Sequence, residues 1–249
     1  MLSKDFCNQI LDYYENYKEE YNKNNIIGII PCECVDDTKQ AYTDNEELME
    51  CIKNELNVAL YVNSQLMSCS NQYIKAVLFH EFTHICDAYN FVGYDNSSFL
   101  MSTYSEYNAM RIEIKEKCKN KPITLNTIIC GENGNISLNE EIEDKIETIL
   151  MILKMTGEKG KEILEQGKEG MFFDLLIKTI SYLFAYLSFF KITEPVYFQN
   201  CFMILENNGL NNIAKKIYNE VQSLDRILDT PNSIILDIVE LYHICFGKI

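Results

Sequence analysis

Apolar residues recur every three or four positions along most of this chain, the spacing of one buried helical face. The first such stretch covers residues 4–22, and Ser3 is a suitable N-cap for it. The spacing predicts two more helices in the first half, at about 71–90 and 101–118. In the second half it predicts further helices at about 171–191, 195–207, 210–227 and 231–245.

A few short segments have strand character instead. Residues 26–30 are a β-branched run that ends at Pro31, and apolar residues alternate over 57–63. Both segments are therefore predicted to be strands. Residues 123–136 contain Asn133-Gly134 and are predicted to form a hairpin.

Two capping-box sequences mark helix starts. Thr43-x-x-Glu46 opens a short helix, and Ser137-x-x-Glu140 opens the helical second half, where glycines at 157, 160, 167 and 170 predict several short pieces. All expected strands precede residue 137. We therefore expect an α+β protein, predominantly helical, with a small antiparallel or mixed sheet in residues 1–136 and an all-helical part in residues 137–249 packed on it.

The chemistry lies in the helix at 71–90, which contains His-Glu-Phe-Thr-His at residues 80–84. Four helical residues advance by about 400°, so His80 and His84 point the same way from successive turns. Two such imidazoles can hold one tetrahedral zinc ion. Glu81, next to the first ligand, is placed to take a proton from a metal-bound water. Only three histidines occur in the chain, and two are in this motif.

A catalytic zinc usually takes three protein ligands, so a third is expected elsewhere. Glu106, on the following helix, lies 22 residues after His84, which leaves room for a loop and a helix packing back. Thr103-x-x-Glu106 is also a capping-box sequence. A helix that begins at Thr103 would direct the carboxylate to a backbone N–H. A helix that begins near Ser98 would leave Glu106 in its body, available to a metal.

Two other acidic residues compete for this role. Asp87, three residues after His84 on the same helical face, is either a ligand or a hydrogen-bond partner of an imidazole. Glu113, one heptad past Glu106, is a further alternative. Donors for a transition-state oxyanion are equally open among Tyr104, Tyr107, Arg111 and His243.

The His-Glu-Phe-Thr-His motif, followed by Ser-Glu-x-x-Ala at 105–109, resembles the gluzincin class of zinc metallopeptidases. Within that class the chain is most similar to the intracellular ImmA/IrrE-like group, over roughly residues 57–113. The resemblance implies a zincin-like fold, His80, His84 and Glu106 as zinc ligands, and Glu81 as general base. It also implies that an edge strand beside the site, 57–63 or 26–30, pairs with extended substrate, and the alternative is that the strand is a plain interior strand.

The chain departs from two patterns of zinc metallopeptidases. Met110 stands four residues after Glu106, where the thermolysin-type pattern has an acidic residue, and no third histidine follows at the metzincin spacing. The partner that orients the zinc ligands is therefore unassigned by the resemblance.

Composition narrows the choice of partners. The net charge of −15 disfavours binding to nucleic acid. Ten cysteines occur without any Cys-x-x-Cys, and no signal peptide is visible, so we expect reduced thiols and a cytoplasmic protein. The apolar run 179–190 is shorter than the roughly twenty residues of a bilayer span and predicts a core helix without membrane association.

The expected function is that of a zinc-dependent metalloendopeptidase acting on protein or peptide substrates. The alternative is a regulatory or protein-binding module with a zincin fold and weak or no proteolytic activity. Neither the oligomeric state nor the cleavage preference follows from the sequence.

Overall fold

The structure is a computed structural model that describes residues 1–21, 26–34, 36, 39–90, 98–131, 134–208 and 210. It is predominantly helical with a small mixed sheet, in agreement with the expected α+β class. The predicted helices at 210–227 and 231–245, and His243, lie outside the described residues. The described chain forms two compact units, and each is treated by itself below.

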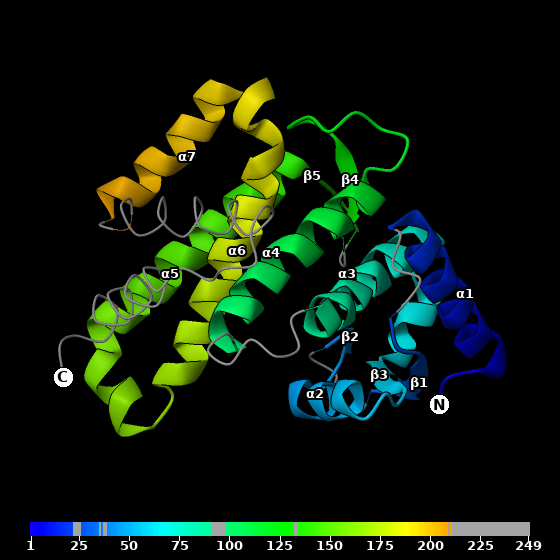
Figure 1. The fold of residues 1–249 in the computed structure, drawn as a ribbon. Helices are drawn as coiled ribbons and strands as arrows, with labels where there is room; N and C mark the ends of the chain where they lie inside the picture. The colour runs from blue at the N-terminus through cyan, green and yellow to red at the C-terminus, as the bar shows by residue number, and fades with distance from the viewer. Residues whose placement is uncertain are drawn as a thin grey trace. The chain divides into compact units, whose positions relative to one another are not determined.

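The first unit contains a three-stranded sheet in the order β1-β3-β2 (Figure 1). Its central strand is β3 (Val58–Val62), which confirms the strand predicted at 57–63. β1 (Ile29–Glu33) runs parallel to β3, and the short β2 (Ala41–Tyr42) runs antiparallel to it. β1 begins later than predicted and continues through Pro31. Because β1 is an outer strand, it tolerates a proline that cannot donate a ladder hydrogen bond.

The chain forms α2 (Asn45–Lys53) between β2 and β3, and the short 3₁₀ helix η1 (Ser64–Ser68) follows β3. The N-cap of α2 is Asp44, whose carboxylate accepts the backbone N–H groups of Glu46 and Glu47, both at 3.0 Å. The predicted capping box at Thr43 is therefore displaced by one residue. An Asp at the N-cap is as favourable as a threonine, and its carboxylate also suits the helix dipole.

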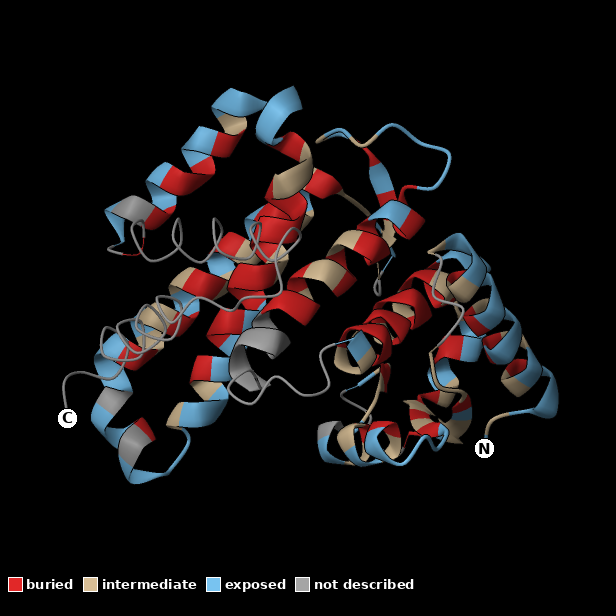
Figure 2. Cartoon of the chain, in the orientation of Figure 1, coloured by how far each residue is buried: buried red, intermediate tan, exposed pale blue. Residues whose placement is uncertain are grey.

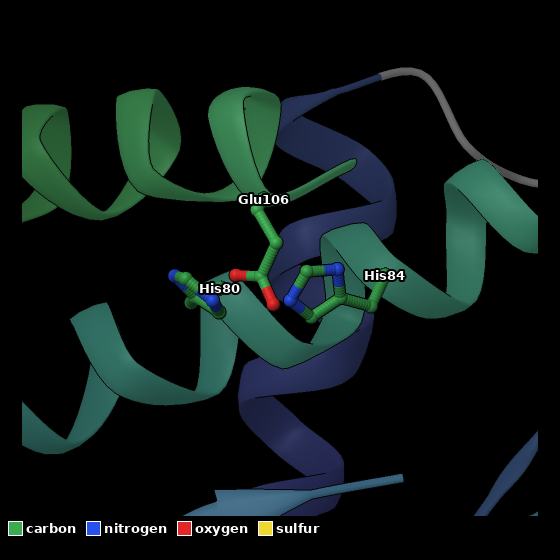
Figure 3. Close-up of side chains that lie close together, drawn as sticks. All are labelled: His80, His84 and Glu106. Carbon is green, nitrogen blue, oxygen red and sulfur yellow. The ribbon is translucent and has the colours of Figure 1, made fainter. Parts of the chain in front are cut away.

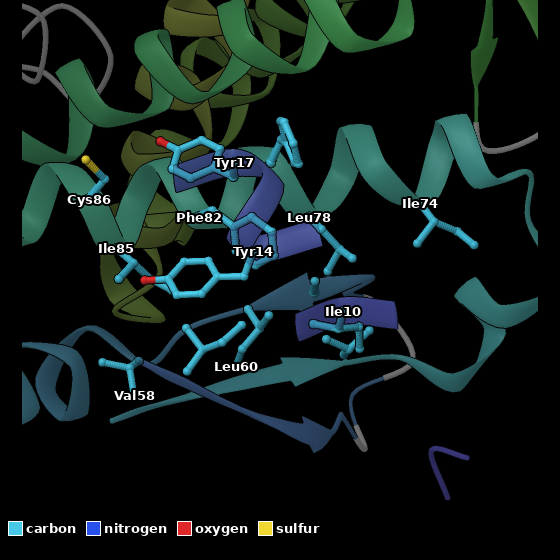
Figure 4. Packing of buried hydrophobic residues seen from close by; sticks show 14 of the residues in the cluster. Ile10, Tyr14, Tyr17, Val58, Leu60, Ile74, Leu78, Phe82, Ile85 and Cys86 are labelled. Atoms are coloured by element: carbon cyan, nitrogen blue, oxygen red, sulfur yellow. The ribbon is translucent and has the colours of Figure 1, made fainter. Parts of the chain in front are cut away.

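One face of the sheet packs against two helices, α1 (Lys4–Glu20) and α3 (Asn71–Asn90) (Figure 4). β3 alternates buried and half-buried residues, so Val58 and Leu60 face this core. The predicted bounds of α3 are confirmed, and Figure 2 shows buried residues along most of its length. A helix buried in this way holds its side chains in fixed positions, which suits a metal site.

α4 (Ser98–Lys117) packs antiparallel to α3. The Gln72 amide, at the start of α3, donates to the carbonyl oxygen of Lys117 at 2.9 Å. Near the other end, the Asn108 amide lies 3.1 and 3.2 Å from the two carboxylate oxygens of Asp87. These contacts fix the register of the two helices, so residues in the middle of α4 face the motif in α3.

The second unit is helical, with α5 (Leu138–Glu165), α6 (Glu169–Thr193) and α7 (Pro195–Asn207). α6 packs against both α5 and α7. This unit also includes residues 98–107, which form the first part of α4, and residues 123–127. The rest of α4 belongs to the first unit. The predicted division of the chain at residue 137 stays a prediction.

Local signals at the start of α5 are confirmed. The Ser137 hydroxyl accepts the Glu140 backbone N–H at 3.2 Å, and the Glu140 carboxylate accepts the Ser137 backbone N–H at 2.8 Å. β4 (Ile128–Gly131) and β5 (Gly134–Ser137) pair just before it, as the predicted hairpin requires. α5 continues through Gly157 and departs from helical geometry only at Lys159, so the predicted short pieces are here one long kinked helix.

Among the described helices, only α6 is long and apolar enough to cross a membrane. In its most apolar window, 61% of the residues are buried within the protein, which is typical of a core helix. α6 therefore packs against two other helices of the protein, α5 and α7. The cellular location stays a prediction.

Candidate metal centre

The two motif histidines lie side by side on α3. Their ring centroids are 4.8 Å apart, and the rings are nearly perpendicular, with an interplanar angle of 77°. Between them in sequence, the Thr83 hydroxyl donates to the Phe79 carbonyl oxygen at 2.7 Å and accepts the Tyr17 hydroxyl at 3.2 Å. This buried link joins the motif turn to α1 and holds it in place.

Glu106 lies in the body of α4. The helix begins at Ser98, two turns before it, so the alternative of a helix capped at Thr103 is wrong.

The carboxylate of Glu106 points between the two imidazole rings (Figure 3). One ligand atom from each of His80, His84 and Glu106 lies within 4.8 Å of the other two. Among the described residues, this is the one group of three potential ligand side chains close enough to share an ion.

The donor set fits zinc. Two imidazole nitrogens and a carboxylate oxygen are a common catalytic zinc set, and tetrahedral ligands at zinc lie roughly 3.3 Å apart. The three side chains of this group therefore supply the ligand types that zinc prefers. His80 is buried, whereas His84 and Glu106 are partly accessible to solvent.

Glu106 also binds two residues of α6 that the sequence analysis missed. The Lys178 ammonium lies 2.8 Å from its Oε1, and the Tyr182 hydroxyl donates to its Oε2 at 2.9 Å. The available signal was the spacing of 178 and 182, four residues apart on one face of an otherwise apolar helix. Both contacts stabilise the ionised carboxylate, the form that binds a metal.

Glu113 lies behind His80. Its Oε2 is 2.8 Å from His80 Nδ1, and its Oε1 is 2.6 Å from the Lys117 ammonium. Burial alone would raise the pKa of Glu113, but Lys117 and His80 together lower it to about 2. The carboxylate therefore carries a negative charge. Glu113 is thus a partner of a ligand, and it is absent from the group of three.

The contact between His80 and Glu113 is short, but its N–H direction departs from a straight hydrogen bond. An imidazole whose Nδ1 donates to a carboxylate presents Nε2 as a lone pair, which is the form that binds zinc.

Asp87 cross-links the helices, since both of its oxygens lie near the Asn108 amide, and it is not part of the group of three. Glu81 is half-buried on α3, next to His80. Of the oxyanion donors considered from sequence, Tyr104 and Tyr107 are buried. The choice among them stays open.

β3 is paired on both sides at Tyr61 and Val62, so the segment 57–63 is an interior strand there. Of the two strands considered for substrate pairing, only β1 is an outer strand. The prediction that substrate pairs with residues 57–63 is therefore wrong for Tyr61 and Val62, because neighbouring strands already occupy both of their sides.

Comparison of the chain with models of protein families, with curated proteins and with solved structures gives no match. The likeness to gluzincins therefore rests on the sequence motif alone. Any functional conclusion has to start from the geometry of the group of three.

Proposed function

We propose that the protein is a zinc-dependent metalloendopeptidase of the gluzincin type, with His80, His84 and Glu106 as the zinc ligands. The observation that carries the proposal is the approach of these three side chains to within 4.8 Å on two antiparallel helices. The chain pattern His-Glu-x-x-His adds a carboxylate, Glu81, at the position expected for a general base.

Bound zinc supplies Lewis-acid chemistry, because it lowers the pKa of a bound water toward neutrality and polarises a carbonyl. The protein residues do the rest. Glu81 accepts the proton of the attacking water and transfers it to the departing amine. Glu106 keeps its negative charge beside Lys178 and Tyr182, and Glu113 orients His80.

A departure from the thermolysin-type pattern is accounted for in this proposal. Position 110, four residues after Glu106, is the buried Met110. The acidic partner of a ligand is instead Glu113, seven residues after Glu106, which reaches His80 from the next part of α4. The proposed substrate is a protein or peptide, and the proposed site of action is the cytoplasm.

The test separates metal binding from catalysis. Metal analysis of purified wild-type protein should find about one zinc per chain. Glu81→Gln should keep that zinc and lose chelator-sensitive cleavage of a mixed peptide pool by several orders of magnitude. The matched control is Glu158→Gln, a change at an exposed carboxylate of α5, which should leave cleavage unchanged. Undiminished cleavage by Glu81→Gln would rule the mechanism out.

A second candidate is a regulatory or protein-binding module that cleaves nothing. The observation that favours it is the pair of protein donors on Glu106, since Lys178 and Tyr182 satisfy this carboxylate without a metal. A wild-type protein that binds no zinc, or binds zinc and cleaves no peptide in the pool, would support this reading.

A further inference from the structure

A buried row of three charged or polar side chains leads away from the proposed zinc site. It runs from His80 on α3 to Glu113 and then Lys117 on α4. We propose that Lys117 is a positioning residue of the metal centre, which acts through Glu113 on His80. This inference rests on the proposed zinc site and concerns how tightly that site holds its ion.

The geometry gives each group one role. The Lys117 ammonium lies 2.6 Å from Glu113 Oε1, and Glu113 Oε2 lies 2.8 Å from His80 Nδ1. The carboxylate is therefore held at one oxygen, which turns its other oxygen toward the imidazole. Because Nδ1 faces this carboxylate at 2.8 Å, the proposal assigns Nε2 of His80 to the metal.

All three side chains are withdrawn from solvent, with relative exposures of 7% for His80, 11% for Glu113 and 7% for Lys117. Burial of an ammonium is costly unless it is paired, so Lys117 has little freedom to leave its carboxylate. The end of α4 is fixed as well, because Gln72 donates to the Lys117 carbonyl oxygen at 2.9 Å. The row therefore transmits orientation, which a mobile surface pair cannot.

A neighbouring lysine offers a control. Lys119, two residues later, pairs with Glu20 at 3.2 Å and Glu116 at 3.5 Å, and its side chain is 44% exposed. Its ion pairs join the ends of α1 and α4, and neither of them involves His80 or Glu113. Loss of Lys119 should therefore leave the zinc ligands as they are.

The experiment measures zinc affinity of the full chain by competition with a chromogenic chelator. Lys117→Met, Glu113→Gln and the double variant are compared with wild type, with Lys119→Met as the control. Lys117→Met should weaken zinc binding by about 10–100-fold, the range found for groups that orient metal ligands. Lys119→Met should stay within about twofold, as expected for an exposed pair. Lys117→Arg should recover part of the loss.

The double variant distinguishes positioning from a general loss of packing. If Lys117 acts through Glu113, its removal adds nothing once Glu113 is an amide, so the double variant should match Glu113→Gln alone. The absorption spectrum of the cobalt-substituted proteins should change in the same two single variants, since it reports the ligand field directly. Circular dichroism of the metal-free proteins checks that each variant is folded.

Three results would overturn the inference: unchanged zinc affinity in Lys117→Met, losses in the double variant that multiply, or a wild-type chain without zinc. The last also removes the proposed function, whereas the first two leave it standing. If Lys117→Met fails to fold, the zinc affinities of Glu113→Gln and the double variant are compared instead. The double variant removes both buried charges at nearly constant volume, so no unpaired charge stays buried. A weaker double variant than Glu113→Gln would then count against a role through Glu113.

Discussion

Glu106→Gln provides the sharpest test of the third ligand. The substitution keeps the side-chain length and one oxygen that can accept the Tyr182 hydroxyl, now 2.9 Å from the carboxylate. It replaces the anionic carboxylate by a neutral amide, which is a much weaker ligand for zinc. Among the described residues no second carboxylate belongs to this group, and Asp87 and Glu113 are held by Asn108 and Lys117.

The expected magnitude follows from mass action. At zinc concentrations 100 times the dissociation constant, binding adds about 2.7 kcal/mol to wild-type stability. For a chain of this length each kcal/mol corresponds to about 2–4 °C, so zinc should raise Tm by about 5–10 °C. A loss of at least about 100-fold in affinity leaves the variant near half saturation, where the gain is about 0.4 kcal/mol and Tm rises by about 1 °C.

The assay is thermal unfolding with and without zinc, followed by circular dichroism under reducing conditions. Glu158→Gln, at an exposed position of α5, is the control for loss of a carboxylate and should show the full wild-type shift. Zinc binding to cysteines of the unfolded chain lowers all shifts alike, so differences between variants survive. If zinc raised the Tm of Glu106→Gln as much as that of wild type, Glu106 would not be the third ligand, and Asp87 would be the next candidate.

Other consequences concern the scaffold and pH. Leu60→Ala should lower the free energy of unfolding by about 2–5 kcal/mol in urea titrations, because Leu60 is fully buried under α1 and α3. Tyr17→Phe should cost about 0.5–1.5 kcal/mol in the same assay, since it removes the hydrogen bond to Thr83. The Ser137 hydroxyl and backbone N–H lower the pKa of Glu140 below its ordinary value of 4.5. This stabilisation should be present above pH 4.5 and lost as pH falls through the lowered pKa, so urea midpoints of wild type and Glu140→Gln should converge in acid.

Long periodic segments were predictable because they follow one dominant pattern. α3 and α7 begin and end where the spacing of apolar residues and Pro195 indicate. The pair His80 and His84 could be placed on one face from helix geometry alone. In each case the relevant information is local in sequence.

Other features depend on contacts between distant segments and were not predictable. The spacing of Lys178 and Tyr182 marks two polar positions on one face of α6, but it does not say that they reach Glu106, more than 70 residues earlier, because the packing of α6 determines that contact. The sequence offered Glu113 as an alternative metal ligand, whereas in the structure its two carboxylate oxygens contact His80 and Lys117. The strand β2, two residues long, is too short to leave a pattern.

The hydroxyl link from α1 to the metal-ligand motif has a practical consequence for work with fragments. Tyr17 meets Thr83 and packs edge-on against Phe79 and Phe82, with ring centroids 5.2 and 5.7 Å away. A shortened protein that begins at the sheet would lack Tyr17 and therefore its aromatic contacts with Phe79 and Phe82 of α3. Zinc titrations on such a fragment would report a damaged helix, so the first twenty residues belong in every sample.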